Sequence, residues 1–397
     1  MRSWDPRIRT RAAITSAWAR YLDPGQALPA LRSGPPRKCP ITALIAKVVA
    51  TYLGQVVPLA SSAVVTFGSL GAAAGIALLA VRTSTFVTGL FLAIEMLAVL
   101  ALIAGGLWHP ARRLLSVIAH PVVLTSTGAW LPVAPAAMAL GAVTAAYATV
   151  GGSQAIAFGE ELKEPHRHMG SVILMAGLIG AAATALPVIA VVLGMGEKTP
   201  IFQSPAPFTA FMTSVAGRAA GVALSASVAA AIFNALIAEV MFSARLFFSF
   251  GRDRVFPSRL SSALARVHKP SGAPRVATIA VALGSAACCL LDSHVLLVFV
   301  SGQVVYGLAL ASFAVLVGRR RGLTGKQGCW RSPLFPLAPI LGLALAFAFA
   351  VADLLDADVG RPSLLIMGAL IGAALLWHRY VLSKRLGGWT PQLPTTG

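Results

Sequence analysis

Four consecutive residues in an apolar stretch, Gly151-Gly152-Ser153-Gln154, have the types and spacing that best fit a ligand site in this sequence. Glycine is a poor helix former, and two hydrogen-bonding side chains follow the pair, so the stretch predicts a break in a helix. A break exposes backbone N–H and C=O groups that lipid cannot satisfy, so it persists only against protein or a wet cavity. In transporters such a cavity binds substrate; the alternative is a glycine contact between intact helices.

Two acidic residues, Glu95 and Glu239, also fall inside apolar runs. Glu95 lies ~13 Å below the inner end of its run, at a depth where a lone charge costs several kcal/mol. We predict that Glu95 is a proton- or ion-coupling site; the alternative is a buried stabilising pair with Lys47, at ~9 Å depth. Glu239 lies near the inner end of its helix, about one and a half turns before Arg245, and we predict a structural role for it.

Catalytic signatures are absent from the sequence. It has no paired acids for a metal-bound diphosphate, no HEXXH, no phosphate-binding loop and no Ser or Cys beside a base. The densest titratable pair, His166 and His168, falls in a polar turn, and the four cysteines lack the CxxC spacing of a zinc site. We therefore expect no enzyme, no metal site and no cofactor.

Long apolar runs must position these residues. Of the 397 residues, 57% are hydrophobic and 11% are charged, which excludes an ordinary water-soluble domain. Runs near the ~20 residues that cross ~30 Å of hydrocarbon predict about ten transmembrane helices. They cover residues 41–59, 62–81, 86–107, 133–157, 171–194, 219–242, 275–293, 295–317, 335–352 and 363–382. Two glycine pairs in these runs, Gly71/Gly75 and Gly368/Gly372, have a spacing that permits close helix contact.

The charge distribution predicts the topology. The chain has 32 Lys and Arg against 13 Asp and Glu, but these basic residues lie in short clusters between apolar runs, which excludes a nucleic acid binder. With the amino terminus inside, 27 basic residues fall on the inner side and 5 on the outer side. We expect a multi-pass protein of the inner (plasma) membrane with both termini cytoplasmic. Its parts would be a basic segment (1–40), a transmembrane domain (41–382) and a tail (383–397).

Two motifs resemble a known family. Glu160-Glu161-Leu-Lys-Glu-Pro165, preceded by Gly151 and followed by Arg167, resembles the end of the sixth helix in amino acid permeases of the amino acid, polyamine and organocation superfamily. Asn234, the stretch from Ser243 to Pro257 and Gly272-Ala-Pro274 resemble that family's eighth helix and the inner loop after it. The resemblance extends from about residue 70 to residue 382.

The resemblance implies an all-α, leucine-transporter-like helix bundle with two inverted five-helix repeats and two extra helices. Such a protein moves amino acids or related amines by alternating access, with a proton or sodium as the possible coupling ion. The substrate-binding residues carried over from the family are Val150, Gly151, Gly152, Ser153 and Gln154. The residues to which we assign structural or gating roles are Lys47, Asn234, Glu239 and Arg245.

This sequence departs from the family pattern in several places. Gly152 and Ser153 stand where an aromatic and an acidic residue are common, which removes a partner for a cationic side chain, and Arg254 stands where glycine usually follows Asp253. The sixth-helix motif falls on the fourth predicted span, so we expect the first two helices to be missing and residues 1–40 to be a non-native start. The alternatives are a non-transporting remnant and, less favoured, a membrane enzyme.

Overall fold

Helices make up nearly all of the described structure. The computed structural model describes residues 35–56, 61–79, 81–108, 110–124, 128–135, 137–138, 141–142, 145, 154, 165–196, 199–204, 206–268, 271–320 and 334–382. The helices are α3 (Pro35–Val56), α4 (Ser62–Ala77), α5 (Val81–Trp108), α6 (Leu114–Ala119), α8 (Pro165–Gly194), α9 (Thr199–Gln203), α10 (Pro207–Arg252), α11 (Ser258–Leu264), α12 (Arg275–Cys288), α13 (Ser293–Ser301), α14 (Gln303–Arg320), α15 (Leu337–Leu355) and α16 (Gly360–Trp377), which continues as a π-helix (His378–Leu382). A hairpin of β1 (Val122–Leu124) and β2 (Trp130–Pro132) completes the described chain.

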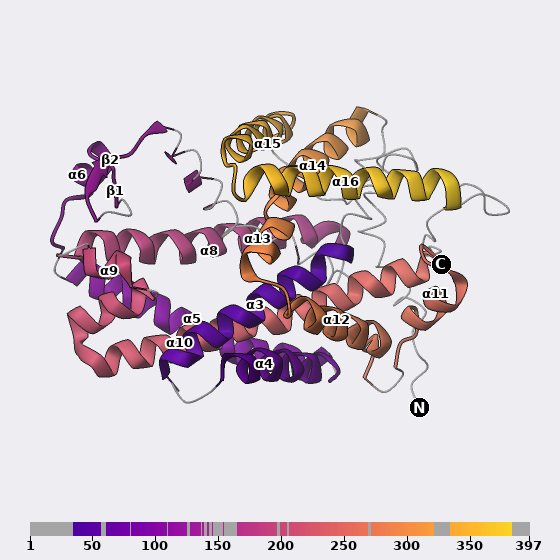
Figure 1. Cartoon of the computed structure of the whole chain (residues 1–397), viewed down its shortest axis with the longest axis horizontal. Helices are drawn as coiled ribbons and strands as arrows, with labels where there is room; N and C mark the ends of the chain where they lie inside the picture. Colours follow the sequence, from indigo (N-terminus) through magenta and orange to yellow (C-terminus); the bar gives the residue numbers. More distant parts are fainter. Residues whose placement is uncertain are drawn as a thin grey trace.

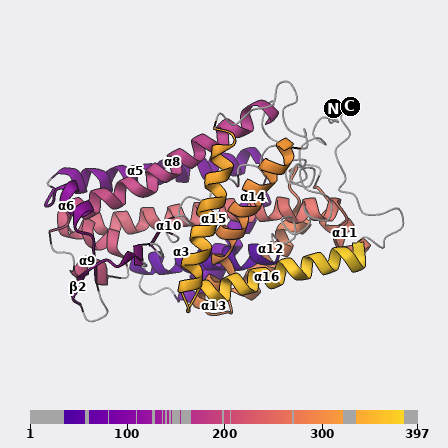
Figure 2. The same ribbon diagram turned by 90° about the horizontal axis from the view of Figure 1, so that it is seen from above.

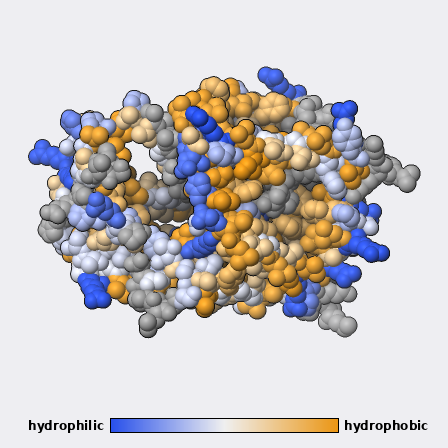
Figure 3. Space-filling model, in the orientation of Figure 1, coloured by the Kyte–Doolittle hydropathy of each residue, from blue (hydrophilic) through white to orange (hydrophobic). Residues whose placement is uncertain are grey.

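Six helical stretches of the described chain are long and apolar enough to cross a membrane. They are Phe86–Trp108, Arg167–Gly194, Pro207–Arg252, Ser293–Arg320, Leu337–Leu355 and Gly360–Val381. Large apolar side chains on them face outward, such as Leu97, Phe347 and Leu365, which are 67%, 73% and 74% exposed. Figure 3 shows that apolar side chains cover a large part of one face. Water does not solvate such a surface favourably, so the all-α, multi-pass membrane bundle expected from the sequence is confirmed.

Nine of the ten predicted spans overlap described helices, but α3, α4 and α12 are not among the six stretches of the described chain that are long and apolar enough to cross a membrane. Most of the tenth predicted span, 133–157, lies outside the described residues. Helix α3 begins at Pro35, ahead of the predicted domain boundary at residue 41. Helix α10 begins at Pro207 rather than at 219, because a kink at Gly217 (φ 83°, ψ 172°) joins a shorter helix to the predicted one. That positive φ favours glycine.

The span predicted over 295–317 is two helices, not one. Helix α13 ends at Ser301 and α14 begins at Gln303, with Gly302 between them. The Gly302 N–H donates a hydrogen bond to the Ser363 hydroxyl of α16, which satisfies a donor that the break frees. At the start of α13, Asp292 Oδ1 accepts from the His294 N–H at 2.8 Å.

The long helices α3 and α10 form the centre of the bundle (Figure 1). Their contact is built from fully buried small and branched residues: Ala43, Ala46 and Val49 on α3 and Leu236, Ile237 and Val240 on α10. Helix α5 runs beside α8, as Figure 2 shows, and also contacts α10. The hairpin and α9 lie at one end of the molecule and α11 lies at the other.

Glycine allows α5 and α8 to approach closely near that first end. A Cβ built on Gly106 of α5 would overlap the Ala190 carbonyl group, and one on Gly194 of α8 would lie 2.6 Å from the Gly106 carbonyl oxygen. Backbone atoms cannot yield to a methyl group as a flexible side chain can. The two glycines therefore set the distance between these helices.

We expect Gly106→Ala to lower the thermal stability of the protein strongly, because the added methyl group forces α5 and α8 apart at a cost of about 1–3 kcal/mol. Gly89→Ala is the matched control on the same helix, because nothing lies within 4 Å of a Cβ at Gly89. The measurement is the melting midpoint in detergent, monitored by fluorescence-detected size-exclusion chromatography. Equal midpoints for the two variants would show that the helices separate freely.

Candidate functional site

A buried carboxylate on α10 is the centre of the candidate site. Glu239 is 2% exposed, in the half of α10 toward α11, and Ser243 follows it by four residues on the same helix face. The Ser243 hydroxyl donates to Glu239 Oε1 at 3.2 Å. A buried carboxylate needs a counter-charge and further hydrogen bonds, because desolvation penalises its charged form.

Lys38 supplies the counter-charge. Its Nζ lies 3.1 Å from Glu239 Oε1, and Lys38 is 4% exposed, so this ion pair is buried. The same ammonium lies 4.3 Å from the centroid of the Phe242 ring, within cation–π range. Lys38 lies in the first turns of α3, where Thr42 Oγ1 donates to the Lys38 carbonyl at 2.6 Å. The pair therefore links the start of α3 to α10.

Gln154 forms a hydrogen bond with the other oxygen of the Glu239 carboxylate. Its Nε2 donates to Glu239 Oε2 at 2.9 Å, so both oxygens of the buried carboxylate are bonded. This bond also orients the amide, because an amide that donates from nitrogen turns its oxygen away from the acceptor. Gln154 Oε1 is the end left to accept a hydrogen bond, for instance from an ammonium group. The candidate site thus joins a predicted substrate residue to a predicted structural residue.

The structure places the other predicted residues as follows. Val150, Gly151, Gly152 and Ser153 lie outside the described residues. Glu95 is half-buried on α5 and makes no ion pair within the described part of the chain, while Lys47 Nζ donates to the Leu291 carbonyl oxygen. The alternative of a Lys47–Glu95 pair is therefore not what this structure forms.

Two predicted structural residues lie on α10 near Glu239. The Oδ1 atom of Asn234 is buried without a hydrogen-bond partner among the residues described here. Arg245 Nη1 donates to the Met241 carbonyl at 3.2 Å, within its own helix. Lys38 is the residue that sequence reasoning missed, because it was counted with the basic segment 1–40. Lys38 lies three residues before the apolar run that forms most of α3, and this position could have indicated that it belongs to the helix rather than to the basic segment.

A family model described as amino acid permease matches residues 39–376. The chain belongs to the amino acid permease family. Over 187 residues it is 25% identical to the branched-chain amino acid permease BcaP of Lactococcus lactis subsp. cremoris (strain MG1363). That match covers 46% of this permease and 38% of the relative, so it spans well under half of the relative's length.

The second family motif forms the end of α10 and the turn after it. The permease keeps helix through Arg252, beyond the predicted end at 242, and Asp253 is 6% exposed beside it. Burial raises the pKa of the Asp253 carboxyl, and the Arg252 guanidinium, 3.3 Å from Oδ1, opposes that rise. Arg254 adopts φ 54°, a left-handed conformation that explains why glycine is usual at this place.

We expect Arg254→Gly to stabilise the permease by about 1 kcal/mol, because it relieves the left-handed backbone cost of a residue with a Cβ. The matched control is Arg266→Gly, beyond the end of α11, where the backbone φ is not positive. The melting midpoint in detergent should rise for the first variant and not for the second. A lower midpoint for Arg254→Gly would mean that contacts of the arginine side chain outweigh the backbone cost.

Proposed function

We propose that this permease is a secondary transporter that carries a zwitterionic amino acid across the inner membrane by alternating access. The observation that carries the proposal is the Gln154–Glu239 hydrogen bond, because it ties the predicted helix break to the scaffold helices α3 and α10. Family membership and the six membrane-length stretches found in the described part of the chain support a membrane transporter.

In this proposal the residues around Gly151 bind the backbone of the substrate. A helix break predicted at Val150 to Ser153 would leave backbone N–H groups that pair with the substrate carboxylate, as helix breaks in transporters do. Gln154 Oε1 accepts from the substrate ammonium group, and Glu239 holds the amide in that orientation. Lys38 neutralises Glu239, so the cluster adds no net charge that would favour a cation.

The side chain of the substrate is proposed to be apolar. Gly152 and Ser153 supply no acidic group for a cationic side chain. The relative from Lactococcus lactis is named for branched-chain amino acids, so leucine, isoleucine and valine are the first substrates to test.

Full-length permease in liposomes tests the function. With unlabelled leucine inside, we expect labelled leucine to enter by exchange, and excess unlabelled leucine to compete more strongly than lysine does. A Gln154→Ala variant should raise the KM for leucine. A folded protein that exchanges no amino acid would support the alternative of a non-transporting remnant.

Glu95 is the proposed proton-coupling residue. We expect Glu95→Gln to abolish leucine accumulation driven by a pH gradient while leaving exchange intact, because a neutral amide cannot carry a proton through the cycle. Asp358→Asn is the matched control, because the Asp358 side chain is 83% exposed. Full proton-driven uptake by Glu95→Gln would contradict this role and would direct attention to sodium.

We also propose that both termini face the cytoplasm, since the basic residues between helices concentrate on that side. The inner side is then the end with α11, and the outer side is the end with the β-hairpin (Figure 1). Reporter fusions after Arg252 and Arg320 should both report the cytoplasm.

A further inference from the structure

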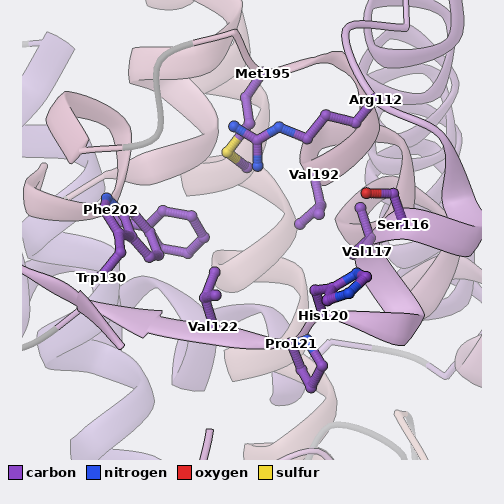
Figure 4. Close-up of a pocket in the computed structure, with 10 residues that line it drawn as sticks. All are labelled: Arg112, Ser116, Val117, His120, Pro121, Val122, Trp130, Val192, Met195 and Phe202. Carbon is purple, nitrogen blue, oxygen red and sulfur yellow. The ribbon is translucent and has the colours of Figure 1, made fainter. Parts of the chain in front are cut away.

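A cavity lies at the end of the molecule that carries α6, α9 and the β-hairpin (Figure 1). Its volume is about 590 Å³, within the ~300–1,000 Å³ of most small-molecule sites. Three parts of the chain form it: the segment with α6, the β-hairpin, and the region where α8 ends and α9 follows (Figure 4). The hairpin register, with Val122 opposite Pro132 and Leu124 opposite Trp130, positions one wall.

One cation extends into this cavity in a fixed position. The Arg112 backbone N–H donates to the Leu193 carbonyl at 3.1 Å, and its Nη2 donates to the Gly196 carbonyl at 3.1 Å. The first bond anchors the backbone of Arg112 at the end of α8, and the second holds one nitrogen of its guanidinium there. The other guanidinium N–H groups have no partner among the described residues. The described residues that line the cavity include no Asp or Glu, so the Arg112 charge has no counter-charge there.

The opposite wall is apolar. The Trp130 and Phe202 rings pack edge to face, with centroids 5.6 Å apart, and join the hairpin to α9. Both rings lie on one side of the cavity in Figure 4, across from Val117. Met195, 2% exposed, also lines the cavity. A cation with no counter-charge among the described lining residues, in a cavity that also has aromatic rings, suits a ligand with one carboxylate and one apolar group.

We propose that this cavity is a second binding site, at which Arg112 binds the carboxylate of a free amino acid and the Trp130–Phe202 wall contacts its apolar side chain. The inference rests on the proposed function, because it places a site for the same substrate class at the proposed outer side. A fixed guanidinium loses little conformational entropy when it binds a carboxylate, which favours capture of a dilute ligand.

Equilibrium dialysis of labelled leucine against full-length permease in nanodiscs of zwitterionic lipid tests the proposal. We expect two equivalents to bind per chain, and Arg112→Gln to lose one of them. Arg113→Gln is the matched control, because Arg113 is the exposed neighbour that does not line the cavity. Trp130→Ala should weaken binding at this site about tenfold for leucine and much less for alanine, which has little side chain to contact the wall.

Leucine analogues identify the recognised group. In Gln154→Ala permease, 4-methylpentanoate, which keeps the carboxylate, should displace the remaining leucine, whereas leucinol, which lacks it, should not. Equal binding by wild type and Arg112→Gln would overturn the second site, as would displacement by leucinol. If Arg112-dependent binding persists while liposomes exchange no amino acid, the proposed function fails and the site stands. If liposomes exchange amino acids but each chain binds one equivalent of leucine, unchanged in Arg112→Gln, the second site fails and the proposed function stands.

Discussion

Lys38→Met is expected to destabilise the permease by about 3–5 kcal/mol, because it leaves the Glu239 carboxylate buried without its counter-charge. Glu239 is 2% exposed, and its other described partners, Ser243 and Gln154, are neutral. Two neutral donors do not replace an ammonium at 3.1 Å in a site from which water is excluded. The expected result is a large fall in the melting midpoint and in the yield of monodisperse protein.

The double variant Lys38→Met/Glu239→Gln should recover most of the loss. It removes both charges and keeps the volume of both side chains. The new amide can accept from Gln154 through its oxygen and donate to the Ser243 hydroxyl through its nitrogen. A double-mutant cycle on melting midpoints measures the coupling, which should be large for groups in direct contact. Lys47→Met is the matched control on the same helix, because Lys47 bonds a backbone carbonyl rather than an acid. A double variant as unstable as Lys38→Met alone would show that the charge pair is not the cause.

The helix content and the family could be predicted from the sequence because both depend on local patterns. Each apolar run of membrane length, and each motif around Glu160 and Ser243, lies within a short segment of sequence and can be recognised there. The Lys38–Glu239 pair joins residues 201 apart in the sequence, so no periodicity indicates it. Glu239 could be singled out by its depth in an apolar run, but its partner depends on how α3 packs against α10.

Close helix contacts also depend on tertiary packing rather than on spacing. Gly71 and Gly75 have the spacing of a helix-contact motif, yet nothing lies within 4 Å of a Cβ built on either. Gly106 and Gly194 have no such motif in common, since they lie on different helices, and there a Cβ would meet backbone atoms. Glycine spacing shows which face of a helix another helix could contact closely. Whether that contact forms depends on where the neighbouring helix packs.

Gln154→Glu is expected to reduce leucine exchange by a hundredfold or more, because it places a second carboxylate against Glu239 Oε2, 2.9 Å from the present amide nitrogen. Like charges in contact cost several kcal/mol, and tenfold in an equilibrium corresponds to about 1.4 kcal/mol. The single charge of Lys38 already pairs with Glu239 Oε1, so it cannot neutralise both Glu239 and the new carboxylate at position 154. Initial rates of exchange in liposomes, normalised to folded protein, measure the loss. Gln154→Ala is the control, because it removes the hydrogen bond without adding a charge: it should raise the KM for leucine but lower the maximal rate of exchange much less than Gln154→Glu does.

The exchanged pair Gln154→Glu/Glu239→Gln separates charge repulsion from the loss of one particular amide. In this variant the new amide on α10 can donate to the carboxylate introduced at position 154, so the described bond re-forms in reverse and stability should return. The negative charge, however, moves from the scaffold helix α10 to the proposed substrate site. The KM for leucine should therefore stay high while cationic amino acids compete better than in the wild type. A stable exchanged pair with wild-type selectivity would place position 154 outside the substrate site, whatever its contact with α10.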